Sequence, residues 1–533
     1  MSVIFLLLLF CPCLLALQVL DENYWKKTSY EDLKESLNLK QNKRIAKNVI
    51  LFIGDGMGPN TVTAARIYKE KEEGYLSWER FDHVGALKTY SNNKMVPDSG
   101  CSGTALFAGV KTNVGTLGVS ADVQRYDCDG SVLEKNRVTT LAKIAQDAGK
   151  ATGIVTTARI THATPAAMYA HTANRDWECD TKMPYYAQQC KDIARQLVED
   201  EPGKNFNVIM GGGRQQLMTD SPATPEDPIA DGWTCTRADN RNLIAEWARQ
   251  KEMQGVRYAM PKNKKELLDL DATKTDYLLG IFRNDHFPFA YEINDTVKEI
   301  PSLEEMATTA VKVLSNNKKG FFLMVESALI DNAHHSGRPR VALSETIELS
   351  KAVQGTMKVL EAAGIKDDTL VIVTSDHSHT LTISGYPDRG SSILGLAGKS
   401  EVDNISYTSL NYATAGIANY KYSVVNGSVV REDPSKIDTT SFEYRPQAGV
   451  PLVENSHGGS DVFVYATGPY AYLFHRMHEQ TYVPEVIQYA FRIGHHGQQI
   501  LLAKARRSGS SMMASSVILI ITMLSMFRLT NFI

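Results

Sequence analysis

NVILFIGDGMG, residues 48–58, is a continuous apolar run that gives way to Asp55 among glycines. Unbroken hydrophobicity predicts a strand buried on both faces, as in a parallel sheet covered by helices. Similar runs occupy 151–157, 206–213, 321–327, 369–377 and 461–469, with amphipathic stretches between them. SETIELSKAVQGTMKVLEAA (344–363) predicts a helix that begins at a serine cap and ends before Gly364. The sequence therefore predicts an α/β fold with a mainly parallel central sheet and helices on both faces.

The composition is that of a large globular protein, with 533 residues of which 43% are hydrophobic and 22% are charged. The formal net charge of -3 provides no basic surface for a polyanion, so we expect no nucleic-acid partner. Residues 384–450 interrupt the alternation of strands and helices with Gly, Ser, Tyr and Asn, which predicts an inserted surface lobe.

Both ends of the chain resemble targeting signals. Residues 1–17 are apolar, turn polar directly afterwards, and predict a secretory signal peptide. Near the other end, small residues from Ser508 precede a spacer and an apolar run from Val517 to Phe527, the order of a GPI-attachment signal over 508–533 with Ser508 as attachment residue. The alternative is a permanent peptide anchor, but that run is shorter than the roughly 20 residues of a spanning helix. We expect a GPI-anchored protein on the extracellular face of the plasma membrane, reached through the secretory pathway.

The cysteines and glycosylation sequons fit an oxidising, secretory compartment. Removal of the signal peptide takes away Cys11 and Cys13 and leaves Cys101, Cys128, Cys179, Cys190 and Cys235. Because that number is odd, at least one thiol stays unpaired within the chain. Sequons at Asn294, Asn404 and Asn426 predict surface glycosylation.

Acids and histidines gather where the apolar runs end. Open α/β sheets bind ligands at the carboxyl ends of their strands, so these side chains are expected to meet there. They are Asp55 after the first run, His162, Thr164 and Arg175 after the second, Glu326, Asp331, His334 and His335 after the fourth, Asp376, His377 and His379 after the fifth, and His457 ahead of the sixth. A lone Asp is usually a turn residue and a lone His a satisfied polar group, but repetition at several strands favours a shared site. Carboxylates with imidazoles suit zinc, and oxygen-rich groups suit magnesium, so more than one metal is expected.

VPDSGCSGTALFAGVKT (96–112) places Ser99 behind an acid and ahead of small residues. That pattern is typical of a helix N-terminus, and a nucleophilic serine is the competing interpretation. The two are compatible, because backbone N–H groups at a helix N-terminus favour an anionic phosphate. Cys101 is interpreted as a buried neutral thiol rather than a zinc ligand.

Six motifs together resemble animal alkaline phosphatases, over roughly residues 45–490. They are GDGMG, DSGCSGTA, THATPAAMYAHTANR, the VE…IDNAHH segment, TSDHSH and SHGGSD. The resemblance, which extends to metazoan GPI-anchored members, implies hydrolysis of many small phosphate monoesters through a phosphoserine at Ser99, with Arg175 clamping phosphate oxygens. The alternatives are a related metal-dependent phosphodiesterase or sulfatase, with threonine or a modifiable cysteine at position 99, and a catalytically silent surface receptor that has lost such residues.

The resemblance also implies two zinc ions and one magnesium ion per subunit. The first zinc would be held by Asp55, Asp376 and His377, and the second by Asp331, His335 and His457. The magnesium would be held by Asp55, Thr164 and Glu326. His162, His379 and Glu454 resemble residues that orient these ligands, whereas His334 is interpreted as structural.

At some positions this sequence differs from the family that it resembles. Asn332 stands where relatives have histidine or lysine, which is expected to affect the pH optimum and phosphate release. Glu226 matches part of a calcium site, but Arg283 replaces a carboxylate there, so calcium is not carried over. The resemblance pairs Cys128 with Cys190 and leaves Cys179 with Cys235.

The resemblance further implies a homodimer and divides the chain into segments. These are an N-terminal arm helix (18–47), a catalytic domain (48–383 and 451–500) and a crown lobe (384–450).

Overall fold

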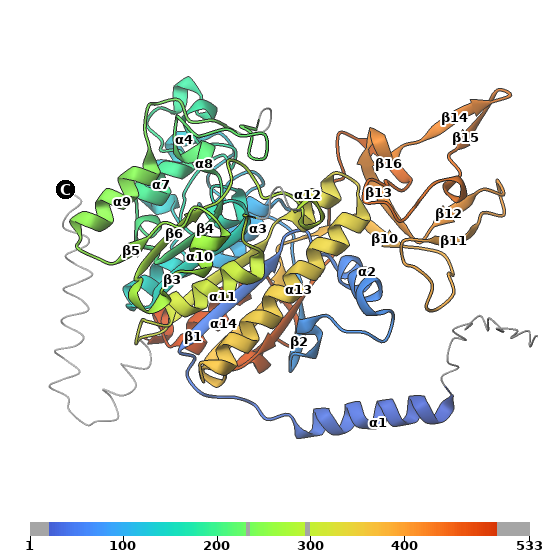
Figure 1. Ribbon diagram of the computed structural model, residues 1–533, viewed down its shortest axis with the longest axis horizontal. Coiled ribbons are helices and arrows are strands. Elements are labelled where there is room, and N and C mark those ends of the chain that lie inside the picture. The colour runs from blue at the N-terminus through green and yellow to red at the C-terminus, as the bar shows by residue number, and fades with distance from the viewer. Residues whose placement is uncertain (1–20, 231–234, 294–298, 498–533) are drawn as a thin grey trace, which may run out of the picture.

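The computed structural model describes residues 21–230, 235–293 and 299–497 (Figure 1). Within these ranges ten strands form one sheet in the order β19-β2-β18-β8-β1-β7-β3-β4-β6-β5. Their bounds are β1 Asn48–Gly54, β2 His83–Lys88, β3 Ala151–Arg159, β4 Val208–Gly212, β5 Tyr258–Ala259, β6 Tyr277–Ile281, β7 Phe321–Ser327, β8 Thr369–Ser375, β18 Val462–Thr467 and β19 Arg476–Glu479. Strand β1 runs parallel to β7 and β8, whereas β18 runs antiparallel to β8 and β2. The predicted α/β fold with a mainly parallel sheet is confirmed.

Helices cover both faces of the sheet. Since successive side chains of a strand point to opposite sides, each central strand contributes to a core on each face. Ile50 and Phe52 of β1 join a core with helices α2, α11, α12 and α13. Val49, Leu51 and Ile53 join a second core with α3, α5, α7, α9 and α14. The helices are α1 Glu22–Asn38, α2 Pro59–Glu70, α3 Ser99–Ala108, α4 Cys128–Val132, α5 Leu141–Asp147, α6 Ala163–Ala166, α7 Ile193–Glu199, α8 Arg214–Leu217, α9 Leu243–Met253, α10 Lys264–Leu268, α11 Leu303–Leu314, α12 Leu329–His335, α13 Pro339–Ala362 and α14 Tyr482–Phe491. An uninterrupted apolar run in the centre of the sheet is therefore what two covered faces require.

Helix α13 begins earlier than the sequence predicts. It starts at Pro339 rather than at a cap formed by Ser344, and it ends at Ala362 as expected. Proline suits the first helical position because its fixed φ matches the helix and its missing N–H would have no partner there. The hydroxyl of Ser344 instead donates to the carbonyl of Arg340, one turn earlier, at 3.0 Å.

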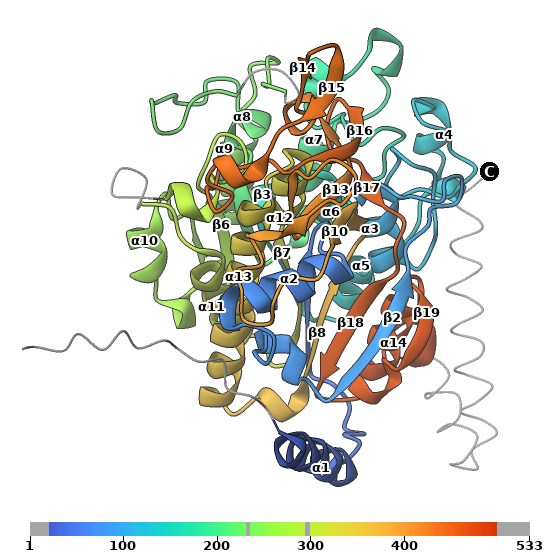
Figure 2. The ribbon, with the colours of Figure 1, turned by 90° about the vertical axis from the view of Figure 1, so that its right-hand side faces the viewer.

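A smaller β-rich part projects from this body and contains most of residues 384–450 (Figure 1). Three strands form its main sheet: β10 (Leu381–Ile383), β13 (Leu410–Gly416) and β16 (Ala448–Leu452). Two hairpin ladders join β11 (Leu396–Lys399) to β12 (Ser406–Thr408) and β14 (Tyr422–Val425) to β15 (Ser428–Arg431). After a quarter turn this part faces the viewer and lies above α2 and α12 (Figure 2).

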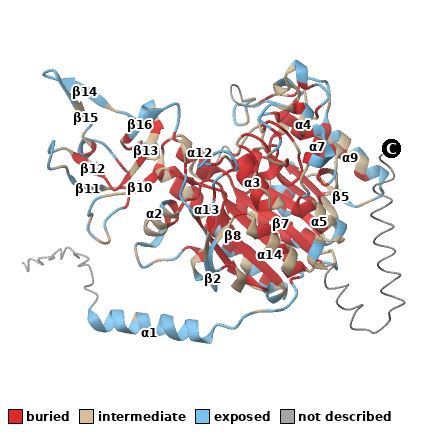
Figure 3. Cartoon of the chain, turned by 180° about the vertical axis from the view of Figure 1, so that it is seen from behind, coloured by how far each residue is buried: buried red, intermediate tan, exposed pale blue. Residues whose placement is uncertain are grey.

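The N-terminal helix α1 lies outside the body and buries none of its residues, in contrast to the sheet (Figure 3). The structure pairs Cys128 with Cys190 and Cys179 with Cys235, as predicted. The predicted signal peptide, the GPI signal with Ser508, and Asn294 lie outside the described residues. No helix in the described ranges has the length and apolar character needed to cross a membrane.

Candidate active site

The predicted site residues meet at the carboxyl ends of the central parallel strands. Asp55 follows β1, Glu326 is the sixth residue of β7, and Asp376 follows β8. A cavity of about 920 Å³ opens beside them. Its lining includes Ser99, His162, Arg175, Asp331, His335, Glu454 and His457. Residues that are far apart in the sequence therefore share one cavity.

Ser99 is buried at the start of helix α3, and its hydroxyl faces two of the predicted ligands. The Oγ atom lies 3.2 Å from Nε2 of His377 and 3.5 Å from Oδ1 of Asp55. The N-cap is Asp98, whose carboxylate accepts from the backbone N–H of Cys101 at 3.2 Å. Because Asp98 caps the helix, the Ser99 hydroxyl is left to face the acids.

Asp376 and His377 reach the same point from the end of β8. Nε2 of His377 lies 3.3 Å from Oδ2 of Asp376. The Asp376 carboxylate accepts from the N–H of Gly56 and from the hydroxyl of Ser102, both at 3.1 Å. Ser102 lies in the DSGCSGTA motif but was not among the predicted site residues. These donors fix the Asp376 carboxylate beside His377, and Nε2 of His377 faces Ser99.

A second group joins helix α12 to the short ladder between β9 (Ser378–His379) and β17 (His457–Gly458). Asp331, His335, His379 and His457 place ligand atoms within 4.8 Å of one another. Nε2 of His335 lies 3.0 Å from Nε2 of His457, and Oδ1 of Asp331 lies 2.5 Å from Nε2 of His379. Asn455 was not predicted from the sequence. Its backbone carbonyl oxygen lies 2.7 Å from Nδ1 of His335, and its side-chain oxygen lies 2.5 Å from Nδ1 of His379. It therefore sets the orientation of both rings.

A third group lies on the other side of Asp55 and is rich in oxygen. Asp55, His162 and Glu326 place ligand atoms within 4.8 Å of one another. Thr164 donates to Asp55 at 3.5 Å, and Thr156, not singled out from the sequence, donates to Oε2 of Glu326 at 2.5 Å. Oε1 of Glu326 and Nδ1 of His162 are buried without a hydrogen-bond partner. Buried polar atoms without partners are rare, so this pocket fits a bound cation with its waters.

The electrostatics of the site also favour bound cations. Burial, together with the neighbouring Asp376, raises the pKa of Asp55 well above its usual value. Burial raises the pKa of Glu326 to about 7 and lowers that of His377 to about 3. Burial opposes ionisation of Asp331 as well, but the imidazoles of His335 and His379 hold its pKa low. Carboxylates crowded in a buried site repel one another, and divalent cations would relieve that repulsion.

Arg175 forms the cationic wall of the cavity. Its Nη1 donates to Oδ2 of Asp98 at 3.1 Å, and its Nη2 lies 3.1 Å from Nε2 of His162. Asp98 also accepts from the N–H of Gly115 at 3.2 Å. From the sequence, Asp98 is expected only as part of a helix N-terminus, and no contact to Arg175 is predicted. Here it both caps the serine helix and orients the guanidinium.

The sequence model of the family described as alkaline phosphatase matches residues 46–493. The chain belongs to the alkaline phosphatase family. It is 43% identical over 484 residues to the tissue-nonspecific alkaline phosphatase of Homo sapiens, covering 89% of each chain. It is 39% identical over 487 residues to the membrane-bound alkaline phosphatase of Bombyx mori, covering 89% of this chain and 86% of that protein. The fold is also similar to that of the Thermus thermophilus alkaline phosphatase, with a TM-score of 0.58, 23% identity, and coverage of 88% of this chain and 97% of that one.

As a member of the alkaline phosphatase family, the protein is a metal-dependent enzyme that hydrolyses phosphate monoesters. This favours the first interpretation of the sequence over a phosphodiesterase, a sulfatase or a silent receptor. The serine at position 99 fits the same conclusion, because the first two alternatives would carry threonine or cysteine there.

The three residues expected from the sequence to depart from the family's motifs have distinct surroundings. Asn332 lines the catalytic cavity. The buried Cys101 thiol donates to the carbonyl of Asp98 at 3.2 Å, and burial raises its pKa well above the usual value, so it is a neutral thiol. Arg283 pairs with Asp227 at 3.3 Å, whereas Glu226 is exposed.

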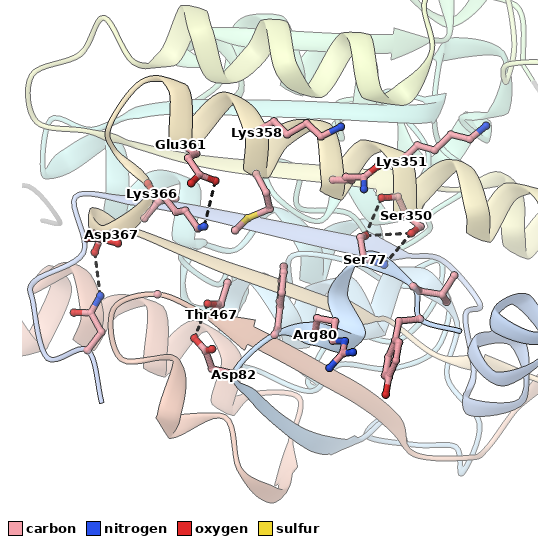
Figure 4. Close-up of a pocket in the computed structure, with 18 of the residues that line it drawn as sticks. Ser77, Arg80, Asp82, Ser350, Lys351, Lys358, Glu361, Lys366, Asp367 and Thr467 are labelled. Atoms are coloured by element: carbon pink, nitrogen blue, oxygen red, sulfur yellow. Dashed lines mark hydrogen bonds and ion pairs between the residues drawn. The ribbon is translucent and has the colours of Figure 1, made fainter. Parts of the chain in front are cut away.

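A second hollow of about 720 Å³ lies at the other end of the sheet (Figure 4). Its lining includes Thr369, the first residue of β8, whereas Asp376 of the candidate site follows the last residue of that strand. Among its lining residues, Lys366 pairs with Glu361 of α13 at 3.4 Å, and Asp82 accepts from the hydroxyl of Thr467 at 2.8 Å. None of the site residues described above lines it. The cavity that contains Ser99 is therefore the candidate active site.

Proposed function

We propose that the enzyme hydrolyses phosphate monoesters by a double displacement in which Ser99 is the nucleophile. The observation that carries this proposal is the position of the Ser99 hydroxyl, buried at a helix N-terminus between Asp55 and His377. In the first step the Oγ–P bond forms while the ester P–O bond breaks, and the leaving alkoxide takes up a proton. In the second step water attacks phosphorus, the Oγ–P bond breaks, and inorganic phosphate and Ser99 are regenerated.

We further propose that the three ligand groups hold two zinc ions and one magnesium ion. Asp55 and Asp376 lie 3.5 and 3.3 Å from Nε2 of His377, and this mixed nitrogen and oxygen set suits zinc. Asp331, His335 and His457 offer a second mixed set of the same kind. Asp55, Thr164 and Glu326 offer only oxygen, which suits magnesium. When bound, such ions activate the nucleophile, polarise the phosphoryl oxygens and stabilise the leaving oxygen.

The protein's own groups bind and orient the phosphoryl group. One N–H donor of the Arg175 guanidinium engages Asp98 and another faces His162, so the remaining donors are available to bind the phosphate. The N-terminus of α3 adds backbone N–H groups and the positive end of its dipole. Both features recognise the phosphate rather than the alcohol, so the proposed specificity for small monoesters is broad.

The test of the nucleophile is a covalent one. Acid quenching of the wild type with radioactive inorganic phosphate should trap label on the chain, and Ser99→Ala should trap none and lose turnover of an aryl phosphate. Ser102→Ala is the matched control from the same helix, and it should still trap label even where turnover slows. Label retained in Ser99→Ala would refute the assignment.

We also propose that the enzyme is a glycosylated, GPI-anchored homodimer at the cell surface. The membrane-bound Bombyx mori relative supports anchoring, and exposed Asn404 and Asn426 support glycosylation. Helix α1 leaves Trp25 and Leu37 exposed, which supports a partner subunit that covers them. Release of activity from membranes by a phosphatidylinositol-specific phospholipase, a mass decrease on deglycosylation, and a dimer mass in sedimentation test the three parts. A monomer mass, an unchanged mass after deglycosylation, or activity retained on membranes would refute the corresponding part.

A further inference from the structure

Two adjacent histidines converge on one carboxylate at the end of helix α14, far from the catalytic cavity. Nε2 of His496 lies 2.8 Å from Oε1 of Glu485, and Nε2 of His495 lies 3.1 Å from the same atom. The two imidazole rings are 4.0 Å apart between centroids. All three ligand atoms lie within 4.8 Å of one another.

The backbone brings these side chains together in a defined way. Helix α14 ends at Phe491, Arg492 adopts a left-handed conformation with φ 59°, and Gly494 does so again with φ 59°. The Arg492 side chain holds this turn, since its guanidinium lies 4.0 Å from the centre of the Tyr489 ring. The reversal points residues 495 and 496 back toward Glu485, which lies within the helix.

One of the two rings is also fixed by packing. The His496 ring meets the Tyr489 ring edge to face at 5.2 Å, and its side chain is only 17% exposed. Glu485 and His495 are 46% and 50% exposed, so an ion and its water can reach them from solvent. The site is thus partly preorganised and open on one side.

The donors match those of zinc. Two imidazole nitrogens and one carboxylate oxygen form a common zinc set with a fourth position left for water, whereas calcium and magnesium prefer oxygen alone. A tetrahedral ion with bonds of about 2.0 to 2.1 Å separates its ligand atoms by about 3.3 Å. The observed separations of 2.8 and 3.1 Å from Oε1 need only small side-chain rotations to reach that value.

This cluster is separate from the catalytic centre. The carbonyl of Ala490 accepts from the N–H of Ala46, two residues before β1 begins, and Lys150 lies over the Phe491 ring at 4.1 Å just before β3 begins. The end of α14 therefore lies at the amino ends of these strands, opposite the catalytic acids. We propose that Glu485, His495 and His496 form a peripheral site for a zinc-type dication, which clamps residues 494–497 to α14.

The experiment measures zinc itself on the holoenzyme. Wild type and His495→Gln/His496→Gln are dialysed against the same rising concentrations of free Zn²⁺, and bound metal is counted per chain. The wild type should bind one zinc ion more than the double variant. It should also be retained longer on a zinc-charged chelating column. Equal activity toward an aryl phosphate shows that the double variant is folded and that its catalytic metals are in place.

Two further variants make the result specific. Glu485→Gln keeps the side-chain size but removes the charge, and it should weaken zinc binding at this site roughly tenfold or more. The matched control is His475→Gln/His478→Gln, which removes two histidines whose rings are 6.2 Å apart and which share no carboxylate. It should keep the extra zinc. Equal zinc counts in the wild type and His495→Gln/His496→Gln, or the same decrease in the control, would overturn the proposal.

Discussion

Replacement of Arg175 by lysine should show how much of catalysis depends on the geometry of the guanidinium rather than on its charge. Arg175 has five N–H donors, of which one engages Asp98 and another faces His162. Those that remain can bind two phosphate oxygens in parallel. A lysine ammonium has three donors around one point and cannot hold Asp98 and two phosphate oxygens in the same arrangement.

The expected magnitude follows from the hydrogen bonds that lysine cannot make. At least one charge-assisted hydrogen bond to the phosphate disappears, and such bonds contribute about 1.5 to 3 kcal/mol. Since 1.4 kcal/mol corresponds to a factor of ten, kcat/KM should fall by about 10- to 150-fold. The inhibition constant of inorganic phosphate should rise by a similar factor, because the same guanidinium donors bind the product.

The assay is steady-state hydrolysis of an aryl phosphate together with product inhibition by phosphate. Arg125→Lys is the matched control, because Arg125 lines the same cavity but is paired with Asp176 at 2.7 Å near its mouth. It should change kcat/KM by no more than about twofold, as expected for a partly exposed ion pair. If Arg175→Lys also stayed within twofold in both constants, the guanidinium would not be the phosphate clamp.

Two further predictions concern stability. Chelation of the metals should lower the melting temperature as well as the activity, because each ion at a thousand times its Kd contributes about 4 kcal/mol and the crowded acids repel one another without it. Addition of zinc and magnesium together should restore both the melting temperature and the activity. An unchanged melting temperature after chelation would contradict this prediction. Glu345 on α13 accepts from the N–H of Ala290 at 2.6 Å, and burial raises its pKa from 4.5 to about 8. The folded state therefore holds its proton while the unfolded state loses it, so this group costs stability progressively between about pH 4.5 and 8, by about 5 kcal/mol at most. Glu345→Gln should become more stable than the wild type across that window when the two are compared by denaturant unfolding. A difference in stability that stays constant from about pH 4.5 to 8 would refute the assignment.

The central strands could be predicted from the sequence, but the edges of the sheet could not. The runs at 48–54 and 321–327 coincide with β1 and β7, because strands covered on both faces must be apolar throughout. Strands β2 and β19 carry partly exposed, mixed residues such as HVGALK and RMHE. β19 is the outermost strand and β2 lies next to it, and this placement is set by main-chain hydrogen bonding, which leaves no pattern in side-chain hydrophobicity.

The candidate site divides in a similar way. Ligands at strand ends could be predicted, because Asp, Glu and His after an apolar run are visible in the sequence. The residues that orient them could not. Asn455 and Thr156 act through hydrogen bonds to His379 and Glu326, and such bonds join segments far apart in the chain. Spacing along the sequence does not encode them, and only the folded backbone brings the partners together.

The ladder between β9 and β17 has a consequence for the biosynthesis of the enzyme. It brings His457 to His335, 122 positions earlier in the chain, after the whole projecting β-rich part has been inserted between them. Closing such a loop costs entropy that is recovered only when its ends pack together. A nascent or truncated chain that lacks residue 457 has an incomplete ligand set at this position. On the proposed ligand assignment, complete metal loading therefore requires a chain that already extends to residue 457 and has folded around the projecting part.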